Sequence, residues 1–274
     1  MQQPAKRSFL RKFFGKIYFR IRRYLYWNFS GVKFSSEKKL ENLDYEVIHH
    51  QSLLLRKLKN VEMWMQHNKV KNLGIAIRKL DGLIIKPGET FSYWRLIGEP
   101  KLRDGYLPGM ILDQGKFKAG IGGGLCQLSN LIYWMVLHSP LTVAERWRHS
   151  YDVFPDSQRV LPFGSGATCS YPNIDLQFRN DTENLFQLRF KLTETHLEGR
   201  LLSKYPPKVF YKIEERNQHF KQEWWGGYTR NNELIQMGFD SETKRKVSEK
   251  LVAKNQAIMM YDPLLEKSTK DKSA

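Results

Sequence analysis

The chain has 274 residues, of which 41% are hydrophobic and 13% aromatic, enough to bury the core of one large domain or two small ones. Its two cysteines allow at most one disulfide, which excludes a disulfide-stabilised secreted scaffold and fits a reducing compartment or a thiol kept for chemistry. The formal net charge of +17 is unevenly spread, because residues 1–30 carry eight basic side chains and no acidic one. This excess favours an anionic partner for the N-terminal segment.

Residues 1–30 have the pattern of a basic amphipathic segment. Bulky apolar side chains recur at about every fourth position from Phe9 to Leu25, with Lys and Arg on the opposite face. Such helices lie in the membrane interface and prefer anionic lipid, so we expect peripheral binding at the inner, cytoplasmic face of the cell membrane. The apolar positions form no uninterrupted run, which argues against a signal peptide and a transmembrane helix. The alternative is a solvated or nucleic-acid-binding arm, although the rest of the chain holds no recognised nucleic-acid motif.

The next region is predicted to be helical and then to change to β-structure. Apolar residues within 42–68 recur at helical spacing, which predicts a long helix inside a helical region at 31–72. His49-His50 point to different faces of that helix and make a poor metal pair. Residues 73–85, with the turn dipeptide Asp81-Gly82 inside them, predict a β-hairpin.

A long irregular region at 98–124, of a kind that is usually functional inside a compact domain, ends in a glycine cluster just before Cys126. The glycines are Gly120, Gly122, Gly123 and Gly124. The apolar segment that follows predicts a helix from Leu125 or Cys126 to about His138. A thiol at the positive end of that helix would have a lowered pKa, and the unpaired backbone N–H groups beside it would stabilise an oxyanion.

Other interpretations of the glycine cluster are also open. A glycine-rich loop before a helix is often only a tight connection, and a free cysteine is often a buried packing residue. Nucleotide binding is disfavoured, because the cluster lacks the GxGxxG spacing and no Lys-Ser or Lys-Thr pair follows it.

Short alternating patterns predict strands through the rest of the chain, at 141–147, 151–154, 167–171, 174–178, 186–190, 197–202 and within 208–262. The fold class is therefore α+β, with a mostly antiparallel sheet, the glycine-loop and cysteine helix packed on it, and an N-terminal helical region. We divide the chain into the basic segment 1–30, the helical region 31–72, a core domain 73–205, a β-rich extension 206–262 and a polar tail 263–274.

A cysteine nucleophile needs a base within hydrogen-bond reach and a group that orients the base. His138 lies on the same helix about 18 Å from Cys126 and cannot serve. His149, on the next element, is the candidate base. Asp175 is the candidate orienter, because a carboxylate in an apolar strand is costly to bury unpaired, and Asp152 is a second candidate. A structural histidine and an exposed carboxylate are the alternatives.

With these residues in place, the chain resembles the VanW family, which is associated with B-type vancomycin resistance. The resemblance covers about residues 75–205 and is carried by Pro87-Gly-Glu-Thr-Phe-Ser92, Gly122-Gly-Gly-Leu-Cys-Gln-Leu-Ser129 with Tyr133, Glu145-Arg146, His149-Ser150-Tyr151, Ala167-Thr168 and Asp175-Leu-Gln-Phe-Arg-Asn180. The ending, from Tyr228 to Tyr261, resembles the stand-alone branch of resistance clusters. Other branches carry an acidic residue before the Ala-Thr pair, whereas Gly166 stands here and supplies no catalytic acid.

The resemblance implies a role in the cell envelope and peptidoglycan metabolism, with glycopeptide resistance as the associated phenotype. The motifs and their neighbourhood give the substrate-binding candidates, namely Gly122, Gly123, Gly124, Gln127, Ser129, Arg146, Arg148 and Ser150. Arg146 and Arg148 suit a carboxylate or phosphate if they face the site, and otherwise are ordinary surface charges.

Three functions are therefore open. The first is a Cys–His enzyme that transfers acyl groups or cleaves amides of a peptidoglycan precursor or stem peptide, with Cys126 as nucleophile, His149 as base, Asp175 as orienter and the Gly123–Cys126 amides as oxyanion donors. The second is a non-catalytic module that binds a cell-wall precursor. The third is an accessory scaffold at the membrane. We expect no metal, no cofactor and no nucleic-acid partner in any of them.

Overall fold

The computed structural model describes residues 8–56, 62–113, 115–153 and 161–261 and has a mixed α+β fold, as predicted. Its helices are α1 (Phe9–Phe29), α2 (Met63–Leu80), α3 (Tyr93–Ile97) and α4 (Cys126–Leu137), with a 3-10 turn at Leu102–Asp104. None of the helices among these residues combines the length and the apolar composition needed to cross a bilayer.

The core is built on a four-stranded antiparallel sheet in the order β1-β10-β9-β2. Its strands are β1 (Tyr45–Leu53), β10 (His196–Ser203), β9 (Phe186–Leu192) and β2 (Ile84–Ile85). Helix α4 packs on β1 and β10, and it lies close to the sheet because Gly199 of β10 has no side chain. A Cβ at Gly199 would be 2.4 Å from Leu131 of α4. The predicted helix after the glycines is confirmed, and it ends at Leu137.

Two small sheets flank this core. One has the order β3-β8-β6, formed by β3 (Thr90–Ser92), β8 (Gln177–Arg179) and β6 (Thr142–Glu145), and the other is the hairpin of β4 (Pro108–Asp113) and β5 (Lys116–Ile121). The region 98–124 is therefore less irregular than expected, because a regular hairpin fills its second half.

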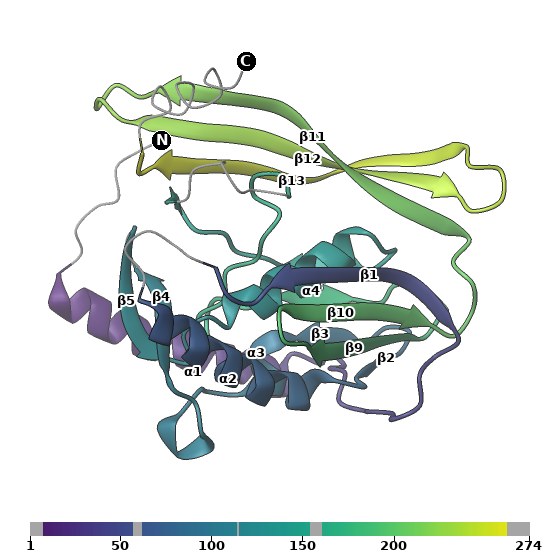
Figure 1. Cartoon of the computed structure of the whole chain (residues 1–274), viewed down its shortest axis with the longest axis horizontal. Coiled ribbons are helices and arrows are strands. Elements are labelled where there is room, and N and C mark those ends of the chain that lie inside the picture. The colour runs from purple at the N-terminus through teal and green to yellow at the C-terminus, as the bar shows by residue number, and fades with distance from the viewer. Residues whose placement is uncertain (1–7, 57–61, 114, 154–160, 262–274) are drawn as a thin grey trace.

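The C-terminal strands form a separate layer above the core (Figure 1). It consists of β11 (Val209–Gln222), β12 (Tyr228–Asp240) and β13 (Lys246–Met259), and the short β7 (Tyr151–Asp152) joins β13 in parallel. The side-chain amide of Gln236 fastens the layer to the end of α4 by donating to the Leu137 carbonyl at 2.8 Å and the Ser139 carbonyl at 3.1 Å. The predicted β-structure between 208 and 262 is confirmed.

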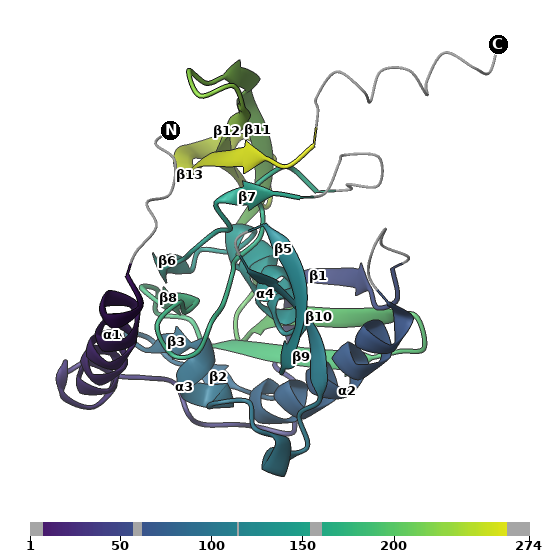
Figure 2. The same ribbon diagram turned by 90° about the vertical axis from the view of Figure 1, so that its left-hand side faces the viewer.

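Helix α1 runs along the outside of the body next to α3 (Figure 2). Its second half is attached by residues at positions 20, 23, 24 and 27, which form one face of the helix at i, i+3, i+4 and i+7 spacing. The start of the helix projects beyond the body (Figure 1), and its large apolar side chains there are exposed. The predicted helix is therefore confirmed, and only part of it packs on the protein.

Three local predictions are wrong. Residues 42–68 contain strand β1 and only the beginning of α2, and residues 73–80 continue α2 instead of starting a hairpin. Residues 45–53 form a strand because they pair with β10, although their apolar residues also fit helical spacing. The start of α2 was missed because its buried face includes the polar residues Gln66 and Lys69, which do not read as apolar positions. Residues 167–171 form no strand beyond a single bridge at Ser170. The tail 263–274 and the end of the predicted strand 151–154 lie outside the described residues.

The close packing of the glycine cluster gives a stability prediction. A Cβ on Gly123 would lie 2.1 Å from the carbonyl of Gly109 in β4, whereas a Cβ on Gly88 would meet nothing within 4 Å. We expect Gly123→Ala to lower the unfolding free energy by about 3 kcal/mol, because two backbones must separate. Gly88→Ala should cost only about 1 kcal/mol, the penalty of its positive φ. Urea unfolding measures both, and equal losses would contradict the packing role.

Candidate functional site

The candidate site is the turn from β5 into α4. Gly122 and Gly124 have φ of +73° and +92°, conformations that favour glycine, and they direct the chain into the helix. Side chains at the three motif glycines would collide with Pro100, with the Gly109 backbone and with the stem of Lys69. The glycines therefore allow the β4–β5 hairpin and α2 to approach the start of α4, and their Cβ sides offer no room for a substrate.

Cys126 is the first residue of α4 and is partly exposed, as a free thiol. Its Sγ donates a long hydrogen bond of 3.5 Å to the carbonyl oxygen of Cys169. Burial raises the pKa of the Cys126 thiol, and hydrogen bonding from the backbone of Cys169 and of Cys126 itself offsets only part of this. The expectation of a lowered thiol pKa is therefore wrong, because burial disfavours the thiolate.

His149 lies in the connection from β6 to β7 and is partly buried. Burial lowers the pKa of its imidazole, and the neighbouring charge of Arg148 lowers it further. Among the described residues, no hydrogen bond or ion pair joins His149 to Cys126 or to Asp175. Asp152 belongs to the C-terminal layer, where it accepts a hydrogen bond from Tyr261 at 2.9 Å. The structure thus does not assemble a Cys–His pair in this conformation.

Asp175 is fully buried and accepts four hydrogen bonds. Its donors are the Ser92 hydroxyl at 2.6 Å, the Trp94 N–H at 2.9 Å, the Leu176 N–H at 3.0 Å and the Gln177 amide at 3.0 Å. Burial raises the pKa of this carboxyl to about 6, although the hydrogen bonds oppose the rise. Asp175 therefore fixes the start of α3, and within the described part of the chain it accepts no hydrogen bond from a histidine.

The same carboxylate is linked to α1 through two neighbours. The indole N–H of Trp27 donates to the Ser92 hydroxyl at 3.1 Å, and that hydroxyl donates on to Asp175. Glu145 accepts two bonds from Arg23 of α1, at 2.6 and 2.8 Å, in a half-buried bidentate pair. Two residues of the sequence motifs, Glu145 and Asp175, therefore hold α1 on the body. No spacing in the sequence connects them to positions 23 and 27.

The two candidate arginines, Arg146 and Arg148, contact other parts of the protein and do not form a pair that faces Cys126. Arg146 donates to the carbonyls of Gly164 and Gly166 and, at 3.0 Å, to the side-chain oxygen of Asn255, and its guanidinium lies 4.9 Å from the Tyr133 ring centroid. It therefore ties β6 to the C-terminal layer. Arg148 lies 5.0 Å from the centroid of the Phe163 ring. Ser150, at the end of the connection, is exposed, and its carbonyl accepts a bond from β13.

Gln127 and Ser129 also serve packing. The side-chain amide of Gln127 donates to the Ser52 hydroxyl and the Leu53 carbonyl of β1, both at 2.9 Å. The buried Ser129 hydroxyl donates to the Ala167 carbonyl at 2.7 Å. Both residues fasten α4 to its neighbours, so the motif around Cys126 is explained largely by the way α4 is held.

Backbone N–H groups that could bind a ligand are left at the start of α4. The backbone N–H of Gly123 donates to the Gly120 carbonyl at 2.9 Å, but within the described chain the N–H groups of Gly124, Leu125 and Cys126 donate no hydrogen bond. Helix starts with free donors attract negative charge. No group of three or more His, Cys, Asp or Glu side chains in the described ranges is placed to hold a metal ion.

Sequence reasoning missed Lys69, a buried lysine of α2 whose stem packs against Gly124. Its ammonium donates to the Gln66 side-chain oxygen at 2.7 Å. Burial, with a smaller contribution from the charge of Arg56, lowers the pKa of Lys69 to about 8. The only sequence signal was indirect: Gln66 and Lys69 continue the helical face formed by Leu73, Ile77 and Leu80.

Comparison with known proteins agrees with the motifs. The family model described as VanW like protein matches residues 68–202. The vancomycin B-type resistance protein VanW of Enterococcus faecalis is 35% identical over 200 residues, which cover 73% of each chain. The uncharacterized protein YoaR of Bacillus subtilis is 28% identical over 120 residues, 44% of this chain and 38% of that protein. No solved structure matches the chain significantly.

The environment of Cys126 predicts slow alkylation. We expect its apparent pKa, measured by iodoacetamide labelling and mass spectrometry across pH, to exceed the value of about 8.5 for a free cysteine, because burial disfavours the thiolate. His149→Ala should leave the labelling profile unchanged. Cys169, whose pKa burial raises further, is the internal control and should react more slowly. A lowered pKa that depends on His149 would contradict this assignment.

The buried carboxyl of Asp175 predicts an inverted pH dependence of stability. Its folded pKa of about 6 exceeds the unfolded value, so the folded state holds the proton more tightly, and stability falls as the pH rises from about 4 to above 6. Relative to Asp175→Asn, the wild type should lose about 3 kcal/mol over this range. Urea unfolding at a series of pH values measures the difference.

A second aspartate serves as the control for this slope. Hydrogen bonds from the backbone N–H and hydroxyl of Thr243 lower the pKa of the partly exposed Asp240. The comparison of wild type with Asp240→Asn should therefore show a slope of the opposite sign. A wild-type minus Asp175→Asn difference that is independent of pH would refute the buried, proton-binding role of Asp175.

Proposed function

The chain belongs to the VanW family, and from this premise we propose that it serves glycopeptide resistance as a non-catalytic accessory module at the cell membrane. In this proposal α1 lies on the anionic cytoplasmic face of the membrane, and the body binds a peptidoglycan precursor there. The resistance context rests on the enterococcal relative, whose name is that of a vancomycin B-type resistance protein.

The observation that carries the proposal is the exposed surface of α1. Ten of its large apolar side chains are exposed, among them Leu10, Phe14 and Phe29 at 65%, 63% and 80%. Apolar surface of this extent on a soluble protein marks a contact with another molecule or a membrane. Basic residues lie between the apolar ones, which is the composition of helices that bind anionic lipid at the interface.

Two further features support this function. The free Cys126 and Cys169 fit a reducing compartment, so they favour the cytoplasmic face. Among the described residues, no base lies at hydrogen-bond distance from the Cys126 thiol, and the pKa of this thiol is raised. Both points favour binding over nucleophilic catalysis.

The second candidate is the Cys–His enzyme that acts on a peptidoglycan precursor or stem peptide. The three N–H groups at the start of α4 that donate no hydrogen bond within the described chain, next to the partly exposed residue Cys126, favour it, because they are suitable donors for an oxyanion. This function requires His149 to move to the thiol. The labelling experiment above separates the two, since an enzyme needs a thiolate that depends on its base.

The membrane proposal predicts loss of vesicle binding when α1 is made polar. We expect Leu10→Asp with Phe14→Asp to abolish co-sedimentation with vesicles that contain anionic phospholipid, because burial of both side chains in the interface is lost and two negative charges are added. Leu40→Asp with Leu102→Asp, which changes two exposed leucines outside α1, is the matched control and should sediment like the wild type. Equal loss in both pairs, or none in either, would rule out α1 as the membrane anchor.

A further inference from the structure

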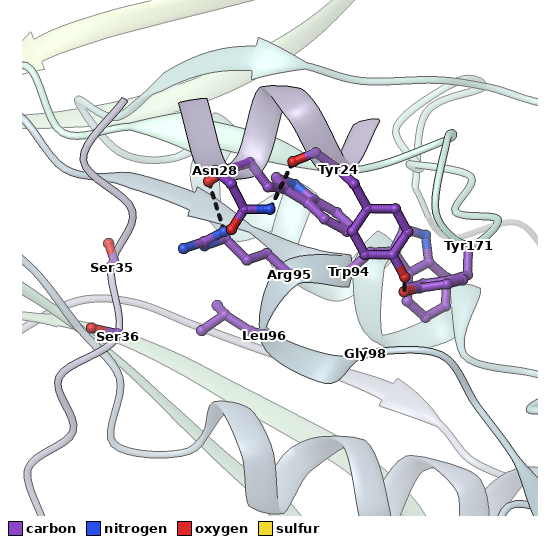
Figure 3. Close-up of a pocket in the computed structure, with 10 residues that line it drawn as sticks. Tyr24, Asn28, Ser35, Ser36, Trp94, Arg95, Leu96, Gly98 and Tyr171 are labelled. Carbon is purple, nitrogen blue, oxygen red and sulfur yellow. Dashed lines mark hydrogen bonds between the residues drawn. The ribbon is translucent and has the colours of Figure 1, made fainter. Parts of the chain in front are cut away.

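A cavity of about 350 Å³ lies between the last turns of α1, helix α3 and residues 35–36 (Figure 3). Its size is at the lower end of the range for small-molecule sites. The lining residues are Tyr24, Trp27, Asn28, Ser35, Ser36, Trp94, Arg95, Leu96, Gly98 and Tyr171. It is separate from Cys126, and none of the predicted site residues lines it.

The first sign of a ligand is a buried hydroxyl without a partner. Ser35 is one of the residues that line the cavity, it is only 2% exposed, and its buried Oγ forms no hydrogen bond with any described part of the chain. Buried hydroxyls are nearly always hydrogen-bonded, so an orphan on a cavity wall indicates an acceptor that arrives from outside.

The second sign is a positioned positive charge. The Arg95 guanidinium donates one bond to the Trp27 carbonyl at 2.8 Å, and it lies 4.7 Å from the centroid of the Phe34 ring. These contacts leave further N–H donors of its fork available. Within the described residues Arg95 forms no ion pair, and no acidic residue lines the cavity. A cavity with one fixed cation, hydroxyl donors and no carboxylate fits an anionic oxygen group.

The position of the cavity indicates which class of anionic ligand it binds. Tyr24 and Asn28 of its wall belong to α1, and the exposed Leu25 and Phe29 are their neighbours on the same helix. A ligand that reaches the cavity along this surface has an apolar part next to its anionic group. On a membrane, that combination is a phospholipid with its phosphate.

We propose that the cavity between α1 and α3 binds the phosphate of an anionic phospholipid headgroup, with Arg95 pairing with the phosphate and the Ser35 hydroxyl donating to it. The lipid chains then lie along the exposed apolar face of α1. This inference rests on the proposed membrane function, and it adds a specific headgroup site to a helix that otherwise binds by burial and charge alone.

The test compares two kinds of vesicle with equal negative charge in a neutral galactolipid background, one charged with phosphatidylglycerol and one with oleate. The wild type should prefer the phosphate-bearing vesicles about tenfold, the effect of one charge-assisted site. Arg95→Gln should remove the preference. Arg103→Gln, which removes the same charge from an exposed residue of the 3-10 turn at Leu102–Asp104, should keep it. No preference in the wild type, or equal loss in both variants, would overturn the headgroup site.

The Ser35→Ala variant tests the headgroup site without an expected loss of stability. The change removes a hydroxyl that has no partner in the protein, so the unfolding free energy should not fall, while the preference for phosphatidylglycerol should decrease by a few-fold. A variant with unchanged preference would contradict the role of Ser35. Loss of stability with an unchanged preference would show that the hydroxyl serves folding instead.

Two further measurements complete the test. One distinguishes a lipid phosphate from a soluble phosphate, and the other distinguishes failure of the membrane anchor from failure of the headgroup site. Trp27 and Trp94 line the cavity, so their fluorescence reports binding of soluble glycerol 3-phosphate. A response to it as strong as that to phosphatidylglycerol vesicles would reassign the cavity to a soluble phosphate and overturn the lipid proposal. Loss of binding to both vesicle types in the Leu10→Asp, Phe14→Asp variant tests the membrane anchor, whereas a failed preference with intact binding refutes the headgroup site alone.

Discussion

The attachment of α1 to a buried carboxylate is the interaction on which the functional surfaces of this protein depend. Asp175 receives hydrogen bonds from Ser92 and Trp94, and Ser92 in turn accepts the indole N–H of Trp27. An ionised carboxylate without exposure to water is tolerated only when all its oxygens are bonded, as they are here. The cost of burying this charge is therefore offset by a network that spans three separate chain segments and fixes α1 beside α3.

The family motifs serve this architecture more directly than they serve chemistry. The glycines before Cys126 let two backbones approach to a distance that no side chain permits, and Gln127 and Ser129 hold the helix that follows. Glu145 clamps Arg23 of α1. A sequence pattern rich in Gly, Cys, Gln and Ser thus resembles a catalytic loop, although most of its polar groups and glycines already make contacts within the fold. The free N–H groups at the start of α4 are what remains for a ligand.

Much of the fold could be predicted from the sequence, and the reasons for the failures are specific. The amphipathic α1, the helix after the glycines and the long C-terminal strands have strong periodicity over many residues, and all three are confirmed. Strand β1 was missed because its apolar residues also fit helical spacing, and its strand state comes from pairing with β10, about 150 residues later. The site was harder, since the partners of Asp175 and Arg146 are set by tertiary packing that a lone sequence does not encode locally.

The cavity and the attachment of α1 share residues, which couples the two. Trp27 and Trp94 line the cavity, and both also bond to the network around Asp175, while Arg95 holds the Trp27 carbonyl. A ligand that binds only when these groups are in place must stabilise the attached position of α1 by its own binding free energy. Conversely, an α1 that is already held by Arg23 and Glu145 presents the cavity preformed, so binding does not have to order the helix. The basic amphipathic helix α1 is therefore held at its C-terminal end, and its exposed N-terminal end can contact a second surface.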